Sequence, residues 1–328
     1  MKRVGHLFEQ VAAYDNLMAA FQLARRGCGN TPAVCRFFFH LEPEILRLQQ
    51  ELLDHHYQPG AYRYFKVHDP KERTIAVAPF RDRVVHHAIV RILTLIYEQV
   101  YISDSYATRP NKGTHMAILR ARHFLRGYSW YLKSDIEKYF DRVDHEILME
   151  LLKRKIKDRA LTDLLYRIIG NAPEPGKGLP IGNLTSQFLA NVYLDPLDHL
   201  IKDRLRVRGY IRYMDDLLLL ANTREELVAH QQAVSDYLES RLALSLKPSA
   251  TWINRSGHGI SFLGMRIFPG IIRVRPENRR RSLKRLEATF SLWRNGELDE
   301  DRMINSAVSI VGHLRYFCPQ MPLNMPVA

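Results

Sequence analysis

Two adjacent aspartates, Asp215 and Asp216, stand in the middle of an otherwise apolar stretch of the chain. The segments before and after them, 209–214 and 217–221, are rich in apolar residues, and Arg212 is the other charge among them. This pattern predicts a β-hairpin whose turn is made of carboxylates. Burial of apolar strands beside two charges is costly unless a cation neutralises them. The pair therefore indicates a metal site. The alternative is an ordinary polar turn, in which Asp is common because its side chain favours turns.

A second acid, Asp135, ends another predicted strand at 129–135. A strand-end aspartate and a hairpin-turn aspartate converge if their two strands are neighbours in one sheet. Two such carboxylates can hold two Mg²⁺ ions about 4 Å apart, the arrangement that clamps the attacking and leaving oxygens in phosphoryl transfer. We therefore expect Asp135 and Asp215 to act together.

The spacing of apolar residues divides the rest of the chain into helices and short strands. A capping box formed by Thr223 and Glu226 predicts a helix start. Helices are expected over 7–21, 41–53, 81–98, 114–126, 144–157, 185–205 and about the last 50 residues, and strands over 129–135, 209–221, 251–254, 259–268 and 271–275. This mixture predicts an α+β fold rather than a wound α/β sheet.

The chain is strongly basic, because 48 Lys and Arg stand against 35 Asp and Glu for a net charge of +13. A protein this basic is expected to meet a polyanion, with nucleic acid as the first candidate, although a generally basic solvated surface gives the same count. A hydrophobic content of 46% excludes a mainly disordered chain. The absence of an 18-residue apolar run argues against a membrane span, and three scattered cysteines are typical of a reducing cytoplasm.

Several motifs, taken in order, resemble those of reverse transcriptases. The palm motifs are Asp135 with Phe140, then Ile181-Gly182-Asn183-Leu184-Thr185-Ser186-Gln187, Tyr213-Met214-Asp215-Asp216 and Phe262-Leu263-Gly264. The runs 81–88 and 105–115 are similar to the first conserved blocks of the bacterial members. One motif alone would be weak, but this set of motifs in order over about residues 10–315 is specific.

The resemblance implies an RNA-directed DNA polymerase, a nucleotidyltransferase with the right-hand fold of fingers, palm and thumb and an antiparallel palm sheet. Residues 1–128 are expected to form the fingers with an N-terminal helical extension, 129–270 the palm, and 271–328 the thumb. Residues about 145–180 of the palm segment are expected to return to the fingers. The chain after the last palm motif is expected to hold a thumb and no endonuclease domain.

The resemblance also implies a site for two Mg²⁺ ions, with Mn²⁺ as the alternative metal. Asp135 and Asp215 would be ligands, the backbone carbonyl of Ile136 would complete a metal shell, and Asp216 would be a nearby third carboxylate. Residues matched to dNTP binding are Arg109, Lys112, Phe140, Ile181, Gly182, Gln187 and Lys247. Residues matched to primer and template binding are Tyr213, Met214, Gly264, Arg280, Arg281 and Lys284.

Several of these roles compete with simpler interpretations. Phe140 is expected to exclude a 2′-hydroxyl on the incoming nucleotide, but it could be a core aromatic. Arg109 and Lys112 match cations that hold a triphosphate, but they could lie in a solvated loop. Lys247 matches a lysine that could donate a proton to the leaving pyrophosphate, but it could also be a solvated lysine before a turn. Gly264 would admit the primer backbone or a tight strand contact. The thumb cations would contact a duplex backbone or form a solvated face.

One departure from the usual second palm motif indicates which branch of the reverse transcriptases the chain resembles. Most reverse transcriptases have Gln-Gly and Ser-Pro where this chain has Ile181-Gly182 and Ser186-Gln187. This variant is similar to the enzymes of diversity-generating retroelements, which copy a template RNA with errors at adenines for mutagenic retrohoming. Such enzymes work with a small basic helical accessory protein. An antiphage-defence or retron-like reverse transcriptase, and a catalytically idle RNA-binding protein, remain alternatives. A bacterial or phage-encoded cytoplasmic protein that binds template RNA, RNA/DNA hybrid and dNTPs is expected.

Overall fold

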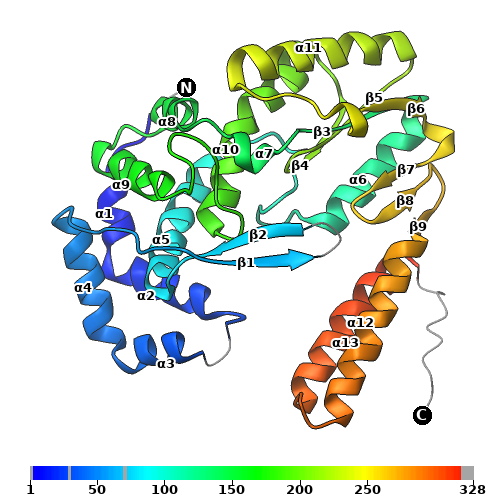
Figure 1. Cartoon of the computed structure of the whole chain (residues 1–328). Helices are drawn as coiled ribbons and strands as arrows, with labels where there is room; N and C mark the ends of the chain where they lie inside the picture. The colour runs from blue at the N-terminus through cyan, green and yellow to red at the C-terminus, as the bar shows by residue number, and fades with distance from the viewer. Residues whose placement is uncertain (1–2, 29–30, 69–71, 319–328) are drawn as a thin grey trace.

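A four-stranded antiparallel sheet with the strand order β4-β5-β3-β6 forms the middle of the molecule (Figure 1). The computed structural model describes residues 3–28, 31–68 and 72–318. The four strands are β3 (Trp130–Asp135), β4 (Gly209–Tyr213), β5 (Asp216–Ala221) and β6 (Trp252–Arg255). The predicted strand at 129–135 and the predicted hairpin over 209–221 are therefore confirmed.

Each face of this sheet is covered by a different set of elements, because successive side chains of a strand point to opposite faces. Leu132, Leu217 and Leu219 belong to a core with helices α8 (His145–Lys155), α10 (Leu184–His199) and α11 (Arg224–Leu242). Tyr131 and Leu218 belong to a second core with helix α6 (Thr114–Gly127). The sheet is thus buried on both sides, which explains its near-continuous apolar strands.

The N-terminal half forms a helical body with one exposed hairpin. Its helices are α1 (Leu7–Ala12), α2 (Tyr14–Arg25), α3 (Pro32–Phe39), α4 (Leu41–Leu53) and α5 (Phe80–Tyr97). Between α4 and α5, strand β1 (Arg63–His68) pairs antiparallel with β2 (Glu72–Val77). Helix α9 (Arg159–Gly170) joins this body, because Asp158 at its start accepts hydrogen bonds at 2.9 Å from the backbone of Leu7 and Phe8.

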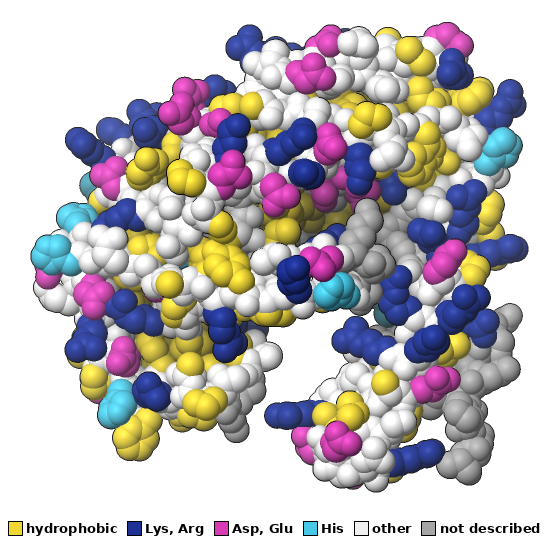
Figure 2. All heavy atoms as spheres, in the orientation of Figure 1, with side chains coloured by type: hydrophobic (Ala, Val, Ile, Leu, Met, Phe, Trp, Pro, Cys, Tyr) yellow, Lys and Arg dark blue, Asp and Glu magenta, His cyan; other side chains and the backbone are white. Residues whose placement is uncertain are grey.

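The C-terminal part begins with a three-stranded sheet of β7 (Ile260–Phe262), β8 (Met265–Ile267) and β9 (Ile272–Val274). Two antiparallel helices, α12 (Pro276–Arg294) and α13 (Glu300–Phe317), extend from it on the far side of a gap from the N-terminal body (Figure 1). Figure 2 shows this gap as a hollow, with Lys and Arg side chains gathered on the side of these two helices. His115 at the start of α6 fixes α13 by stacking on Tyr316, with ring centroids 4.3 Å apart.

The α+β class and the antiparallel sheet are confirmed, and two helices differ from their predictions. The helix expected over 7–21 is broken at Ala13, which is extended, into α1 and α2. The helix expected over 185–205 ends as α10 at His199 and continues as a π-helix over Leu200–Arg204. Pro196 lies inside α10 and has no N–H for the helix ladder, which accounts for the altered hydrogen bonding that follows it. None of the helices in the described ranges has the length and apolar character needed to cross a membrane.

Candidate active site

The predicted carboxylates meet at one end of the central sheet. Asp135 is the last residue of β3 and lies in register with Asp216, the first residue of β5. Met214 adopts a left-handed conformation with φ of 55°, which turns the chain sharply between β4 and β5. Ile136 donates its backbone N–H to the carbonyl oxygen of Asp215 at 3.3 Å. The hairpin turn and the end of β3 are thus joined, and the structure brings Asp135, Asp215 and Asp216 together.

The electrostatics of Asp215 fit a site for a hard cation. Burial, together with the charges of Asp135 and Asp216, raises the pKa of Asp215 to about 7, while the charge of Arg73 opposes this rise. A divalent cation bound by oxygen ligands would relieve this repulsion. Within the described ranges, no three His, Cys, Asp or Glu side chains form a group that could hold a metal ion unaided. Backbone, water and substrate oxygens must therefore supply part of any coordination shell.

Asp216 has a partner of its own, which separates its role from that of Asp215. Its carboxylate lies 3.4 Å from the ammonium of Lys133, one pleat back on β3. Lys133 in turn lies over the ring of Trp252 on β6, 5.5 Å from its centroid. Asp216 is therefore partly neutralised by the protein itself, in keeping with its prediction as a nearby third carboxylate.

Lys247 lies beside the end of strand β3. Its backbone N–H donates to the carbonyl oxygen of Asp135 at 2.8 Å, and Glu137 donates to the carbonyl oxygen of Ser245 at 2.9 Å. These bonds fasten the segment after α11 to the end of β3. The structure thus places Lys247 next to Asp135, although 112 positions separate the two in the sequence.

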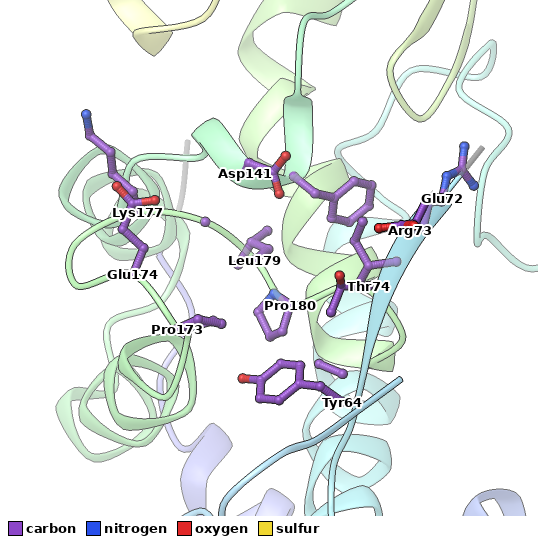
Figure 3. Close-up of a pocket in the computed structure, with 14 residues that line it drawn as sticks. Tyr64, Glu72, Arg73, Thr74, Asp141, Pro173, Glu174, Lys177, Leu179 and Pro180 are labelled. Carbon is purple, nitrogen blue, oxygen red and sulfur yellow. The ribbon is translucent and has the colours of Figure 1, made fainter. Parts of the chain in front are cut away.

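A cavity of about 360 Å³ opens beside this end of the sheet, between strand β2 and the segment 173–181 (Figure 3). Phe140 and Ile181 both line it, and Tyr64 and Thr74 of the exposed hairpin form the opposite wall. Figure 3 shows Pro180 and Leu179 on one side and Thr74 on the strand facing them. Two residues matched to dNTP binding therefore share one cavity wall.

Gly182 explains how the 181–187 segment approaches the hairpin so closely. Its φ is +115°, and a Cβ there would lie 2.7 Å from Cγ2 of Ile75 and 2.8 Å from the carbonyl oxygen of Ala76. Ala76 donates its N–H to the carbonyl oxygen of Ile181 at 2.7 Å, and Asn183 donates its side-chain amide to the carbonyl of Ala76 at 3.2 Å. Only glycine permits this contact, so the segment and β2 form one unit.

Phe140 offers a direct test of sugar selection. Its ring is partly buried, lines the cavity and packs edge-on against Tyr139 with centroids 5.5 Å apart. We expect Phe140→Ala to raise ribonucleotide incorporation relative to dNTP incorporation by about 10-fold or more, because loss of the ring removes the steric clash with a 2′-hydroxyl. Single-nucleotide extension with matched dNTP and rNTP measures the ratio. An unchanged ratio would identify Phe140 as a core aromatic only.

Arg109 and Lys112 have partners different from the predicted phosphates. The guanidinium of Arg109 is 4% exposed and forms a two-point ion pair with Glu98, with both N–O distances at 2.9 Å. It also donates to the carbonyl oxygens of Ile102 and Ser105. Lys112 donates to the carbonyl of Ser103 at 2.7 Å. Both cations therefore hold the 98–112 loop in shape, and this structure offers no phosphate position at Arg109.

Gln187 is attached to the same loop. Its side-chain oxygen accepts a hydrogen bond from the hydroxyl of Thr108 at 3.4 Å. Asn191, one turn further along α10, donates to the carbonyl oxygen of Ala107 at 2.8 Å. The loop is thus fixed to helix α10 from both positions, and Gln187 lies at the boundary between that helix and the loop.

Arg73 is the exposed cation that acts on the aspartates. It lies on β2, lines the cavity and lowers the pKa of Asp215 by its charge, against the larger effect of burial. Arg81, by contrast, is paired with Glu51, and Arg83 donates to the carbonyl oxygen of Ala24. Of these three arginines, Arg73 is therefore the one that lines the cavity beside the aspartates.

The residues matched to primer and template lie at the end of β4, in the small C-terminal sheet and on α12. Tyr213 shares a hydrogen bond of 3.0 Å with the hydroxyl of Thr114 at the start of α6. Gly264 has a φ of +83°, and a Cβ there would lie 2.6 Å from Nδ2 of Asn278 on α12. This glycine therefore serves the contact between the small sheet and α12. Further along α12, the cations Arg280, Arg281 and Lys284 have exposed side chains.

Sequence reasoning missed a buried ion pair beneath the hairpin turn. Arg212 and Asp198 are both 0% exposed, and the guanidinium contacts both carboxylate oxygens at 2.6–3.0 Å. The hydroxyl of Tyr210 also donates to Asp198, at 2.7 Å. Arg212 further donates to Asn191 at 2.9 Å and to the carbonyl oxygen of Met214 at 3.3 Å. The lone arginine inside the apolar stretch was the signal that could have revealed this pair.

The sequence was compared with protein-family models and with known proteins. A family model described as reverse transcriptase (RNA-dependent DNA polymerase) matches residues 66–267, more than half of the chain. Protein YkfC of Escherichia coli (strain K12) is 28% identical over 274 residues, which cover 69% of this chain and 72% of YkfC. The group II intron-encoded protein LtrA of Lactococcus lactis subsp. cremoris is 31% identical over 170 residues, 49% of this chain.

The chain spans only 28% of the length of LtrA, so the match concerns a part of that protein. Among solved structures, telomerase from Candida albicans in complex with a fragment of telomeric RNA is similar with a TM-score of 0.51. That likeness covers 79% of this chain and 55% of the telomerase chain at 12% sequence identity, and it concerns the fold alone.

Proposed function

Because the chain belongs to the reverse transcriptase family, we propose that it copies a template RNA into cDNA from dNTPs. The observation that carries the proposal is the meeting of Asp135 and Asp215 at neighbouring strand ends, beside the cavity lined by Phe140 and Ile181. The substrates would be a primer on an RNA template and a dNTP. Primer extension on RNA templates tests the proposal.

Two Mg²⁺ ions, when bound, would stabilise the negative charge that develops on the transferred phosphoryl group. Asp135 and Asp215 would hold them, with the Ile136 carbonyl as a further ligand. Arg73 would bind the triphosphate from the hairpin side, because an arginine fork matches phosphate oxygens. Phe140 and Ile181 would orient the sugar and base, and Lys247 lies where it could give a proton to the leaving pyrophosphate.

We further propose that the enzyme serves a diversity-generating retroelement and makes errors at template adenines. The support is the sequence at 181–187, where Ile181 replaces the usual Gln. Ile has similar bulk but no donor or acceptor, so a misaligned pair loses fewer directional contacts than it would beside an amide. A small basic helical accessory protein would be its partner. With a net charge of +13, the chain would meet that partner through RNA or a local acidic patch.

Ile181→Gln tests the origin of these errors. We expect the variant to lower misincorporation opposite adenine by roughly 5- to 150-fold, the value of one or two restored hydrogen bonds of about 1–3 kcal/mol. The measurement is single-nucleotide extension opposite each template base, comparing kcat/KM for right and wrong dNTPs. Ile181→Leu, which adds no polar group, is the matched control. Equal ratios in wild type and Ile181→Gln would show that Ile181 is a packing residue.

The similarity to LtrA favours a second candidate, a reverse transcriptase that acts on a group II intron RNA. The two candidates differ in the DNA beside the gene. A template repeat and a variable repeat that differ mainly at adenines would support the retroelement. An intron RNA structure around the gene would support the second candidate. Sequencing of cDNA made in cells separates both from a defence enzyme that makes untemplated DNA.

A further inference from the structure

A basic hollow lies at the end of the central sheet that faces away from the catalytic aspartates. We name it the palm-end patch. It is a cavity of about 690 Å³ between helix α6 and the segment that follows the π-helix. Its charged and titratable members are Asp104, Arg120, His123, Arg126, Lys202 and Arg208. None of these residues has a role in the proposed polymerase site.

Strand β4 separates the palm-end patch from the catalytic turn. Arg208 directly precedes Gly209, the first residue of β4, whereas Tyr213 at the other end adjoins the turn with Asp215. Four steps of a strand span about 13 Å. Tyr128 closes the patch against this strand, since a Cβ at Gly209 would lie 2.9 Å from its ring. Arg208, on the rim of the patch, therefore lies about a strand length from the catalytic turn.

The palm-end patch carries a surplus of positive charge. Asp104 is 5% exposed and accepts from Arg120 and Lys202, both at 2.8 Å. Burial acts to raise the pKa of Asp104, but the hydrogen bonds from these two cations outweigh it and lower the pKa. This single acid stands against four cations, which leaves a net charge of +3 with His123 neutral. Such mutual repulsion is relieved by a bound polyanion.

Two of the four cations have donors to offer. Arg208 is exposed, and in the described ranges its guanidinium has neither a hydrogen bond nor an ion pair. Arg126 is exposed and uses its Nε for the carbonyl oxygen of Pro269 at 2.7 Å, which leaves its terminal nitrogens for a ligand. Two arginine forks on the rim of one hollow match the oxygens of phosphate groups.

The rings that line the palm-end patch differ in exposure: His123 is exposed, Tyr128 is half-buried against strand β4, and Phe124 is buried. Phe124 is 7% exposed, with the guanidinium of Arg120 at 4.3 Å and the ammonium of Lys202 at 5.6 Å from its centroid. The strongly exposed large apolar side chains of the described residues all lie elsewhere. Single-stranded nucleic acid is bound by stacking on exposed rings, and protein partners need apolar contacts. The patch has no strongly exposed large apolar side chain, and its arginines fit a phosphate backbone.

We propose that the palm-end patch binds the backbone of a base-paired RNA segment, separate from the template strand at the aspartates. Helical RNA is recognised by its shape and phosphates, which suits two arginine forks on the rim of one hollow. The inference rests on the proposed function, because an enzyme that copies one RNA gains from holding a folded part of that RNA. The patch would anchor this part while the template strand passes the active site.

The test uses the double variant R126E/R208E of the full chain and a labelled RNA hairpin with a stem of about 20 base pairs. We expect the Kd for the hairpin to rise at least 10-fold. The slope of log affinity against log salt should fall by about 2, because two phosphate contacts are lost. R224E/R241E is the matched control, with the same change in charge at exposed sites on α11, on the other face of the sheet. It should change the Kd less than 3-fold.

Two further measurements separate the palm-end patch from the polymerase site. Wild-type protein preloaded with a primer–template should still bind the hairpin, and R126E/R208E should extend a short unstructured template at the wild-type rate. Equal loss of hairpin binding in the control, or full competition by the primer–template, would overturn the patch. The wild type could be inactive in primer extension while hairpin binding is lost only in R126E/R208E. That result would overturn the proposed function and leave the patch supported.

Discussion

Asp135→Asn and Asp215→Asn are each expected to lower polymerase activity at least ~100-fold while leaving RNA binding intact. Each substitution keeps the side-chain size but removes a charge from a site that fits divalent cations, so the stabilisation that a metal gives the transition state is lost. Steady-state primer extension measures the activity, and filter binding of the same template measures the affinity. Near-normal cDNA synthesis in either variant would contradict the assignment.

Stability measurements make this prediction sharper. Asp135, Asp215 and Asp216 repel one another in the absence of metal, and burial and this repulsion raise the pKa of Asp215 to about 7. Removal of one charge should therefore leave the Tm of the metal-free protein equal or higher, as expected where function is held at a cost in stability. Asp163→Asn, on the exposed face of α9, is the matched control and should keep full activity. A large fall in Tm would indicate a structural role instead.

Arg212→Met is expected to lower the free energy of unfolding by about 3–5 kcal/mol, because it leaves Asp198 buried without its cation. Denaturant unfolding measures this change. The double variant Arg212→Met/Asp198→Leu replaces the pair by apolar side chains and should recover most of the stability. Arg212→Lys keeps the charge without the two-point geometry and should lie between these variants.

The double variant also separates a positioning role from a purely structural one. Arg212 donates to the carbonyl oxygen of Met214, which adjoins Asp215 in the hairpin turn. Even with stability restored, we expect kcat about 10- to 100-fold below wild type, because small displacements of a catalytic group are costly. The KM for dNTP should change little. Recovery of both stability and kcat in the double variant would show that the pair serves the fold alone.

The fold class and the enzyme class follow from the sequence and are confirmed by the family match. Strand ends, a carboxylate turn and the Thr223 capping box can be predicted because each depends on residues close together in the sequence. The structure contains all three. The same local signals predicted which acids come together. They could do so because strands β3 and β5 are neighbours, and antiparallel register aligns their ends.

Contacts that depend on how loops and helices pack in three dimensions were beyond these signals. Nothing near Arg109 in the sequence indicates that Glu98 and two carbonyl groups occupy its guanidinium. The matching of Arg109 to a triphosphate contact therefore relied on motif position alone. Asp198 likewise appears in the sequence as one polar residue of a helix, and its pairing with Arg212 depends on how α10 packs on β4. Close approach of Gly182 to β2 is a third contact of this kind.

Above all, we propose that this chain makes DNA on an RNA template. The most direct measurement is extension of an annealed primer on a defined RNA with dNTPs and Mg²⁺, followed by sequencing of the product. We expect cDNA complementary to the RNA, made by wild type and absent with Asp215→Asn. Bound RNA without templated dNTP incorporation, with Mg²⁺ or Mn²⁺ and with or without the proteins encoded beside the gene, would contradict it.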